Sequence, residues 1–290
     1  MWHALDAQGY WQSEIWNRKK DGEIFPEWLS ISVVRDETGE VTHYIGSFTD
    51  ISERKQAEQR IHQLAFYDPL TQLANRRLFL DRVGHARATS ERTRQHCALL
   101  MLDLDHFKML NDTQGHHAGD ELLVEVGRRI RRQVREADTV GRLGGDEFVI
   151  LLESLSEDRD HAAAYVSEIA TKVHGNLLQS FNLTGIKDYR MTTSLGATLF
   201  QGRGTSLEEL LKQADVALYE GKSAGRNSIR FFNPDMQHKV DQRASLETAL
   251  SRALDQEEFQ LYYQPQVDRD GNLIGAEALL RWLPEPGEPV

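Results

Sequence analysis

The sequence has a single cysteine, Cys97, among its 290 residues, so no disulfide can form within the chain. Cys97 opens the apolar run 97–102, where a buried and unreactive thiol is expected. No apolar run approaches the roughly 20 residues that a membrane helix needs. Residues 1–20 also lack the basic start and apolar centre of a signal peptide. We therefore expect a reducing, cytoplasmic environment and no membrane contact by this chain, although a longer parent protein could be membrane-anchored.

Positive charge is in short supply, because 34 Lys and Arg residues face 45 Asp and Glu residues and leave a net charge of −11. A chain with this balance has no general electrostatic attraction for nucleic acid or for an anionic membrane surface. Nucleic acid is therefore not an expected partner. Any polyanionic ligand must be captured by a local site.

The composition, 40% hydrophobic and 27% charged, is typical of a soluble globular protein, and the length suggests more than one domain. Four of the five tryptophans lie in the first 28 residues, which indicates a separate unit over residues 1–50. Strand-forming runs alternate there with turn residues, so an antiparallel meander is expected. Residues 51–66 predict a helix with a narrow apolar seam, which could be a short coiled coil or a simple linker.

Residues 67–234 alternate between helix and strand patterns and predict an α/β domain. The expected strands are Cys97–Asp105, two strands within Thr139–Leu152, and Tyr189–Phe200. The expected helices are Gly119–Ala137, Arg159–Leu178 and Leu207–Ala224.

Two acidic clusters stand at the ends of predicted strands. Asp103-Leu104-Asp105 closes the first strand, and Gly144-Gly145-Asp146-Glu147-Phe148 lies between two strands. Carboxylates can hold Mg²⁺ through oxygen, and adjacent glycines allow a backbone to approach a phosphate closely. Each cluster alone is more simply read as a helix cap or a turn, but the pair points to a cation site.

The stretch Asp68–Phe232 resembles the GGDEF-domain diguanylate cyclases. The resemblance rests on the following segments, which occur in the order found in that family: Asp68–Arg77, Asp103–Lys108, Asn111-Asp112, Gly115–Asp120, Gly144–Phe148 and Lys222–Asn227. It implies an α/β (α+β) palm-like nucleotidyl cyclase domain, with a central mixed or antiparallel sheet flanked by helices. The implied reaction joins two GTP molecules into cyclic di-GMP with release of pyrophosphate, and uses Mg²⁺ or Mn²⁺.

The resemblance also assigns residues. Asp103, Asp146, Glu147 and the main-chain carbonyl of Leu104 would hold metal, with Asp146, Glu147 and Lys222 in catalytic roles and Glu147 either a ligand or the base. Asn111 and Asp120 would bind guanine, since a carboxylate can accept both N–H groups of the guanine edge. The other GTP-binding residues implied are Phe107, Lys108, His116, Gly144, Gly145, Lys222 and Arg226.

Simpler interpretations stay open for several of these residues. Asp120 could be the N-cap of the following helix. Lys222 and Arg226, spaced i, i+4 on one predicted helical face, could be a solvated basic surface. Arg135 and Asp138 match the position of an RxxD product-inhibition site in the family, but a merely basic helix surface would also explain the neighbouring arginines.

The flanking segments resemble parts of two other families. The stretch Trp11–Arg35, followed by Asp50–Lys55, resembles the C-terminal half of a PAS sensor domain, which would occupy residues 1–50. The segments Tyr262–Pro265 and Glu277–Trp282 resemble the start of an EAL phosphodiesterase domain over residues 235–290, in which Glu277 would be a metal ligand and Arg281 a substrate contact. A barrel of that type needs about 250 residues, so no phosphodiesterase activity is expected from this chain. A helix is expected at Ser245–Asp255, and strands at Phe259–Val267 and Leu273–Leu279.

The expected function is therefore a diguanylate cyclase that acts as a homodimer, because the product is two-fold symmetric. Cyclic di-GMP would be both product and inhibitor. The alternative is a regulatory module that binds GTP or cyclic di-GMP and controls an EAL phosphodiesterase in a longer bacterial signalling protein.

Overall fold

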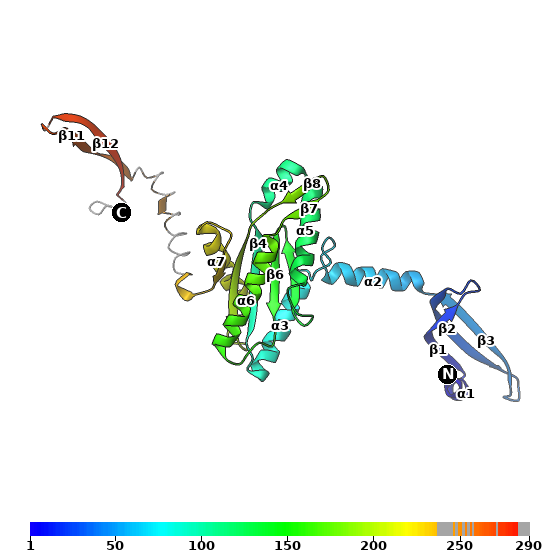
Figure 1. The fold of residues 1–290 in the computed structure, drawn as a ribbon. Helices are drawn as coiled ribbons and strands as arrows, with labels where there is room; N and C mark the ends of the chain where they lie inside the picture. Colours follow the sequence, from blue (N-terminus) through cyan, green and yellow to red (C-terminus); the bar gives the residue numbers. More distant parts are fainter. Residues whose placement is uncertain are drawn as a thin grey trace. The chain divides into compact units, whose positions relative to one another are not determined.

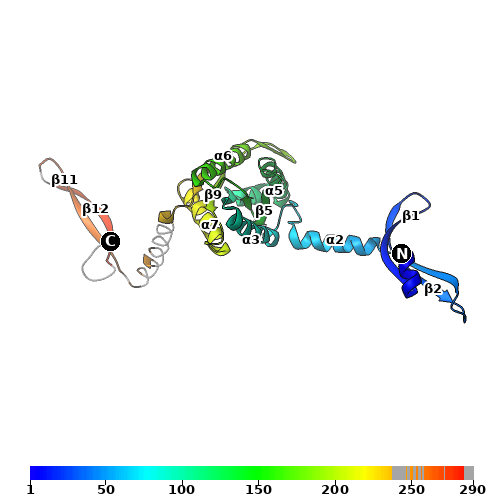
Figure 2. The same cartoon turned by 90° about the horizontal axis from the view of Figure 1, so that it is seen from below.

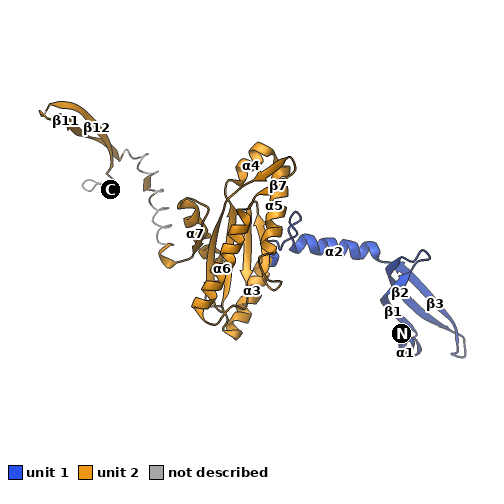
Figure 3. Cartoon of the chain, in the orientation of Figure 1, with its two compact units in different colours: residues 1–78 blue, residues 79–290 orange. Residues whose placement is uncertain are grey.

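The computed structural model describes residues 1–236, 246, 249–250, 253, 256, 258–270 and 272–283. The chain divides into two compact units, residues 1–78 and 79–290 (Figure 3). Most of the helix expected at Ser245–Asp255 lies outside the described residues. Within the described part of the chain, no helix is long and apolar enough to cross a membrane.

The first unit contains a three-stranded antiparallel sheet of order β1-β2-β3, so the predicted meander is confirmed. Its strands are β1 (Tyr10–Arg18), β2 (Ile24–Arg35) and β3 (Val41–Asp50), and a short helix α1 (Trp2–Gln8), which the sequence did not indicate, precedes them. The turns between the strands contain Gly22 and Gly39, with φ values of 93° and 88° that other residues rarely adopt.

Helix α2 (Ser52–Phe66) follows the sheet, as predicted. Its seam residues Ile61 and Leu64 are 66% and 67% exposed, so nothing in the described chain covers them. At the start of the helix, Arg54 and Lys55 form ion pairs with Glu14 of β1 at 2.8 and 2.6 Å.

The second unit is built on a five-stranded sheet of order β10-β9-β4-β6-β5 (Figure 1). The strands are β4 (Cys97–Leu104), β5 (Thr139–Gly144), β6 (Glu147–Leu152), β9 (Thr193–Phe200) and β10 (Ile229–Phe231). The central strand β4 is buried along its whole length and runs antiparallel to both β6 and β9, whereas β10 is parallel to β9. The predicted mixed sheet is therefore confirmed.

Helices cover both faces of this sheet (Figure 2). Helices α3 (Arg76–Thr93) and α7 (Leu207–Ser223) pack against one face, in a core that includes Phe79, Leu99 and Leu218. Helices α5 (His116–Arg131) and α6 (Arg159–Leu177) lie on the other face. At Gly196 of β9 an added Cβ would lie 2.1 Å from the carbonyl oxygen of Ala214 in α7, so helix and strand touch through their backbones.

Two predicted elements have clearly different bounds. The helix expected at Gly119–Ala137 runs from His116 to Arg131, because Gly115 (φ 85°) starts it and Arg131 donates to the carbonyls of Arg135, Glu136 and Asp138, which hold the following residues in a turn. The strand expected at Tyr189–Phe200 is interrupted at residues 190–192. Its first residue ends β8 (Ile186–Tyr189), which forms a hairpin with β7 (Phe181–Leu183).

Three further elements complete the described chain. Helix α4 (Phe107–Gln114) follows β4. Beyond β10, strands β11 (Phe259–Val267) and β12 (Leu273–Trp282) pair in an antiparallel hairpin. Both strands were predicted, and β12 continues three residues beyond its expected end.

Candidate active site

The two acidic clusters come together at one edge of the central sheet. Asp103, at the end of β4, is the direct register partner of Glu147 at the start of β6. Directly paired residues in an antiparallel ladder place their side chains on the same face, with Cβ atoms about 4.5–5.5 Å apart. The fold therefore brings Asp103 and Glu147 together from positions 44 residues apart in the sequence.

The glycine pair forms the tip of the β5–β6 hairpin. Gly144 and Gly145 have φ values of 151° and 52°, and Gly144 pairs with Glu147, so Gly145 and Asp146 make a two-residue turn. Arg142 braces this turn by donating from Nε and Nη2 to the carbonyl oxygen of Gly145, at 3.0 and 2.7 Å. Arg142 was not among the predicted site residues, because a hydrogen bond to a main-chain oxygen requires no particular motif in the sequence.

Asp103 has the most perturbed environment of the acidic group. Its side chain is 13% exposed, and Lys222 Nζ lies 2.7 Å from Asp103 Oδ2. Burial raises the pKa of Asp103 above the usual aspartate value, the ion pair with Lys222 opposes this rise, and the charges of Asp146 and Asp105 add to it. Positive charge at this edge of the sheet would therefore stabilise the ionised form of Asp103.

The donor set fits a hard divalent cation. Asp103, Asp146, Glu147 and the carbonyl of Leu104 offer only oxygen atoms, which Mg²⁺ prefers. Within the described residues, no three acidic, His or Cys side chains converge as a complete metal cluster. Mg²⁺ is commonly held by one or two carboxylates together with phosphates and water, so an incomplete protein set is compatible with a site that a triphosphate completes.

The predicted guanine-binding residues lie where α4 and α5 touch. A Cβ added to Gly119 would lie 2.0 Å from Asn111 Oδ1, so the helices approach closely at this point. Asn111 Oδ1 is buried and accepts no hydrogen bond from any described residue. Asp120 is exposed and lies in the second turn of α5, whose N-cap is Gly115, so the interpretation of Asp120 as an N-cap is wrong. His116 is the exposed first residue of the same helix.

The predicted phosphate-binding residues come from two elements. Phe107 and Lys108 occupy the first turn of α4, where main-chain N–H groups have no partner within the helix. Lys222 lies in the last turn of α7, but Arg226 does not continue that helix. Gly225, Arg226 and Asn227 all have positive φ values, of 122°, 63° and 47°, so the chain leaves the helix in a tight turn. The prediction that Lys222 and Arg226 share a helical face is wrong.

Arg135 and Asp138 lie together in the turn after α5. Asp138 is 5% exposed, and its carboxylate accepts hydrogen bonds from the main-chain N–H groups of Arg135 and Glu153 at 2.9 and 3.3 Å. The guanidinium of Arg135 lies 4.5 Å from the ring centre of Tyr165. Arg135 therefore stands beyond the basic helix rather than on its surface.

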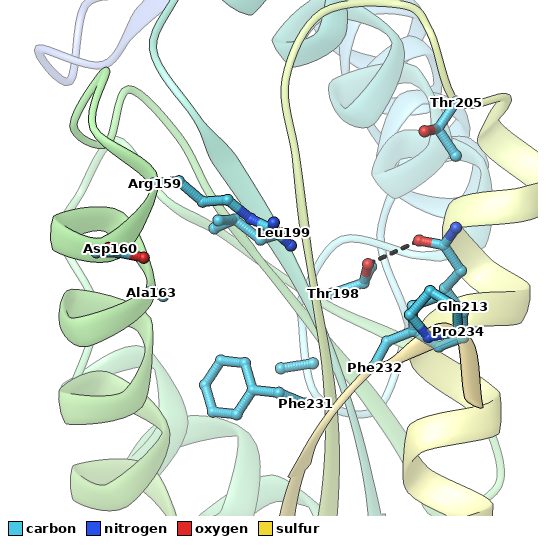
Figure 4. A pocket seen from close by; sticks show the side chains of 11 residues that line it. Arg159, Asp160, Ala163, Thr198, Leu199, Thr205, Gln213, Phe231, Phe232 and Pro234 are labelled. Carbon is cyan, nitrogen blue, oxygen red and sulfur yellow. Dashed lines mark hydrogen bonds between the residues drawn. The ribbon is translucent and has the colours of Figure 1, made fainter. Parts of the chain in front are cut away.

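A pocket of about 480 Å³ lies elsewhere in the domain (Figure 4). It is lined by residues of α6, β9, α7 and the segment around β10, including Thr198, whose hydroxyl donates to Gln213 Oε1 at 2.8 Å. None of the predicted site residues lines it.

The predicted EAL residues lie on β12. Glu277 is exposed and pairs with Gln264 of β11, and Arg281 donates to the carbonyl of Leu280. Glu277 is one acid on one strand of a hairpin, and it does not belong to any metal cluster of the described residues.

Comparison with known proteins agrees with this geometry. Residues 65–228 match the diguanylate cyclase GGDEF domain, and residues 1–53 match a PAS domain. The bifunctional diguanylate cyclase/cyclic di-GMP phosphodiesterase MucR of Pseudomonas aeruginosa is 41% identical over 228 residues, which cover 78% of this chain and 32% of MucR. The cyclic di-GMP phosphodiesterase NbdA of the same organism is 35% identical, over 80% of this chain and 29% of NbdA. The chain thus spans about a third of the length of these relatives.

Solved structures resemble the second unit. The GGDEF domain of TpbB (YfiN) from P. aeruginosa is 33% identical with a TM-score of 0.56, covering 60% of this chain and 99% of that one. The coiled coil and GGDEF domain of DgcB from Caulobacter crescentus, solved with cyclic di-GMP, is 28% identical with a TM-score of 0.56, covering 62% of this chain and 93% of that one. With the family match, these likenesses show that the chain belongs to the GGDEF family of diguanylate cyclase domains, with a PAS domain match at its N-terminal side.

Proposed function

We propose that residues 67–234 condense two GTP molecules into cyclic di-GMP and pyrophosphate. The observation that carries this proposal is the direct pairing of Asp103 in β4 with Glu147 in β6. Asp146 precedes Glu147 in the hairpin, and Lys222 forms an ion pair with Asp103. It unites carboxylates that suit a divalent cation with a lysine that suits a phosphate. Phosphoryl transfer needs this combination, because negative charge develops on the attacking and leaving oxygens.

The chemical roles follow from exposure and charge. A bound Mg²⁺ or Mn²⁺, held by Asp103, Asp146, Glu147 and the Leu104 carbonyl, would stabilise negative charge on the phosphate oxygens. The 3′-hydroxyl oxygen of one GTP forms a bond to the α-phosphorus of the other, and the bond from that phosphorus to the pyrophosphate oxygen breaks. Glu147 is exposed and Asp146 is half-buried at the hairpin, and either is available to accept the hydroxyl proton. Lys222 and Arg226 would offset charge on the triphosphate, and Phe107, Lys108, Gly144 and Gly145 would contact it through their main-chain N–H groups.

Recognition of guanine is proposed for Asn111 and Asp120, with His116 nearby at the start of α5. The guanine edge carries N1–H and N2–H donors, and a carboxylate at Asp120 can accept both. Asn111 Oδ1 is a buried acceptor without a described partner, and an N–H of the base would satisfy it. Adenine lacks that pair of donors and would leave both side chains unsatisfied.

Each domain would hold one GTP, so the reaction is proposed to need two copies facing each other. The exposed Ile61 and Leu64 on α2 offer a seam for a second helix, which would assist pairing. For inhibition, Arg135 and Asp138 are proposed to bind the product. The two-pronged guanidinium of Arg135 suits a phosphate or the Hoogsteen edge of guanine. The Asp138 carboxylate accepts two hydrogen bonds from main-chain N–H groups and has lone pairs left to accept others.

A second function has specific support in the names of the relatives. NbdA and the Escherichia coli protein PdeR, which is 34% identical over 244 residues, are both named cyclic di-GMP phosphodiesterases. In a longer parent the domain could bind GTP or cyclic di-GMP and control an EAL domain, of which residues 235–290, with Glu277 and Arg281, would be the start. We propose that the PAS part covers residues 1–50, the helical linker 51–66, the GGDEF domain 67–234 and the EAL segment 235–290.

The decisive experiment is incubation of the purified chain with GTP and Mg²⁺, followed by chromatography for cyclic di-GMP. Asp146→Ala and Glu147→Ala should abolish synthesis without loss of folding, since both lie in a surface hairpin, and Glu37→Ala, in an exposed turn of the first unit, should not affect it. GTP binding without turnover by the wild type would favour the regulatory function. Substantial turnover by either hairpin variant would overturn the site assignment.

A further inference from the structure

Asp105 is buried beside the proposed metal site but has no role in the function described so far. It is 5% exposed, and its carboxylate accepts three hydrogen bonds: from Thr192 Oγ1 at 2.7 Å, from Ser194 Oγ at 3.0 Å and from the main-chain N–H of Asn227 at 3.1 Å. Its own N–H donates to the carbonyl of Thr192 at 3.0 Å. A carboxylate with this many partners is fixed in position.

The turn that Asp105 contacts is strained. Asn227 and Arg226 are non-glycine residues with φ values of 47° and 63°, and they follow Gly225 at 122°. Consecutive left-handed residues persist only when surrounding contacts hold them. Within the turn, the Arg226 N–H donates to the carbonyl of Gly221 at 3.1 Å, and the Asn227 N–H is held by Asp105 Oδ2.

The same turn is joined to the end of β4 at two points. Lys222 precedes the turn and its Nζ lies 2.7 Å from Asp103, whereas Asn227 ends the turn and binds Asp105. Asp103 and Asp105 are two residues apart at the end of one strand. Arg226 lies between the two points of attachment, so its main-chain position depends on both.

We propose that Asp105 is a positioning residue, which fixes the turn 224–227 relative to the metal-binding end of β4 and thereby places Arg226 to bind the β- and γ-phosphates of GTP. This inference rests on the proposed function, because it assumes that Arg226 contacts the triphosphate. Asp105 itself touches neither substrate nor metal in this proposal. Its partners Thr192 and Ser194 keep the carboxylate directed at the Asn227 N–H.

The test compares two nucleotides that differ in the phosphates concerned. Calorimetry with Mg²⁺ measures the affinity of the full chain for guanosine 5′-[α,β-methylene]triphosphate, which cannot release pyrophosphate, and for GMP, which lacks the β- and γ-phosphates. Asp105→Asn keeps the shape of the side chain but replaces one acceptor oxygen by a donor. We expect it to weaken binding of the triphosphate analogue about tenfold and to leave the affinity for GMP within about twofold.

Two further variants separate positioning from general damage. In an Arg226→Ala background, Asp105→Asn should have little additional effect on the triphosphate analogue, because both changes remove the same contact. Ser194→Ala, which removes a partner of the other carboxylate oxygen, should have a smaller effect than Asp105→Asn.

The outcomes distinguish this inference from the proposed function. If the wild type binds neither nucleotide and forms no cyclic di-GMP, the proposed function fails. If the wild type binds the triphosphate analogue and Asp105→Asn binds it equally well, or loses GMP to the same extent, only the positioning role of Asp105 is overturned.

Discussion

Gly119 offers a change that should separate substrate affinity from stability. In Gly119→Ala the new Cβ would lie 2.0 Å from Asn111 Oδ1, 3.0 Å from Asn111 Cγ and 3.2 Å from Phe107 Cζ. The nearest atoms belong to the end of a flexible side chain, so the fold can adapt if Asn111 turns away. Alanine in a helix interior is also more stable than glycine by about 0.5–1 kcal/mol, which would offset part of the cost of that rearrangement.

We expect Gly119→Ala to lower the affinity for the guanine base of GTP and to change the stability of the fold little. Losing one hydrogen bond to the base costs about 0.5–1.5 kcal/mol, which corresponds to a two- to twelvefold rise in KM for GTP. The melting temperature should stay within a few degrees of the wild type. Initial rates of cyclic di-GMP formation over a range of GTP concentrations, together with thermal unfolding, measure both quantities.

Two controls make this prediction strict. Gly84→Ala, at an exposed helical position in α3 where an added Cβ meets no atom within 4 Å, should leave KM unchanged. In an Asn111→Ala background, Gly119→Ala should raise KM no further. A KM of Gly119→Ala equal to that of the wild type would refute the reasoning. So would a rise in KM on adding Gly119→Ala to Asn111→Ala as large as the rise in the wild-type background.

Two other predictions follow from the site. Because burial raises the folded-state pKa of Asp103, stability is lost as pH rises through that pKa. In the absence of metal, Asp103→Asn should therefore have a higher melting temperature than the wild type at pH 7. This difference in melting temperature should disappear below about pH 3.9, where an ordinary aspartate is protonated. The same variant should not synthesise cyclic di-GMP. A lower melting temperature at pH 7 would contradict this. Arg135→Ala should keep the initial rate of cyclic di-GMP formation but remove the slowing as product accumulates, and progress curves identical to the wild type would exclude an inhibitory role.

Much of the fold was accessible from the sequence because its strands are short apolar runs with clear turn residues at their ends. The strand ending at Asp103 and the hairpin around Gly144 and Gly145 are formed by local patterns, and the structure has them where they were expected. The two acidic clusters were expected to form one cation site, but the direct pairing of Asp103 with Glu147 is a long-range register that no local pattern specifies.

Two of the errors have a common physical cause, since both involve a hydrogen bond between distant segments. Hydrophobic periodicity extended the strand back to Tyr189, but Thr192 leaves the ladder to bind Asp105. Helical spacing placed Arg226 on α7, but Gly225 and the contact of Asn227 with Asp105 end the helix first. Arg142 and Asp105 were not singled out as structural supports, because their partners are main-chain groups and hydroxyls that no local motif reveals.

The contact between Gly196 and α7 has a consequence for how the domain can be switched. With an added Cβ at 2.1 Å from the Ala214 oxygen and 2.3 Å from the Leu218 nitrogen, helix and sheet are already in backbone contact and have no room to move closer. Sliding α7 would also displace Lys222 from Asp103. In the proposed two-chain reaction each domain would supply one half of the catalyst, and an upstream signal would act by changing how often two such halves meet in the productive orientation. Its output would resemble a change in encounter frequency more than a change in the shape of either half.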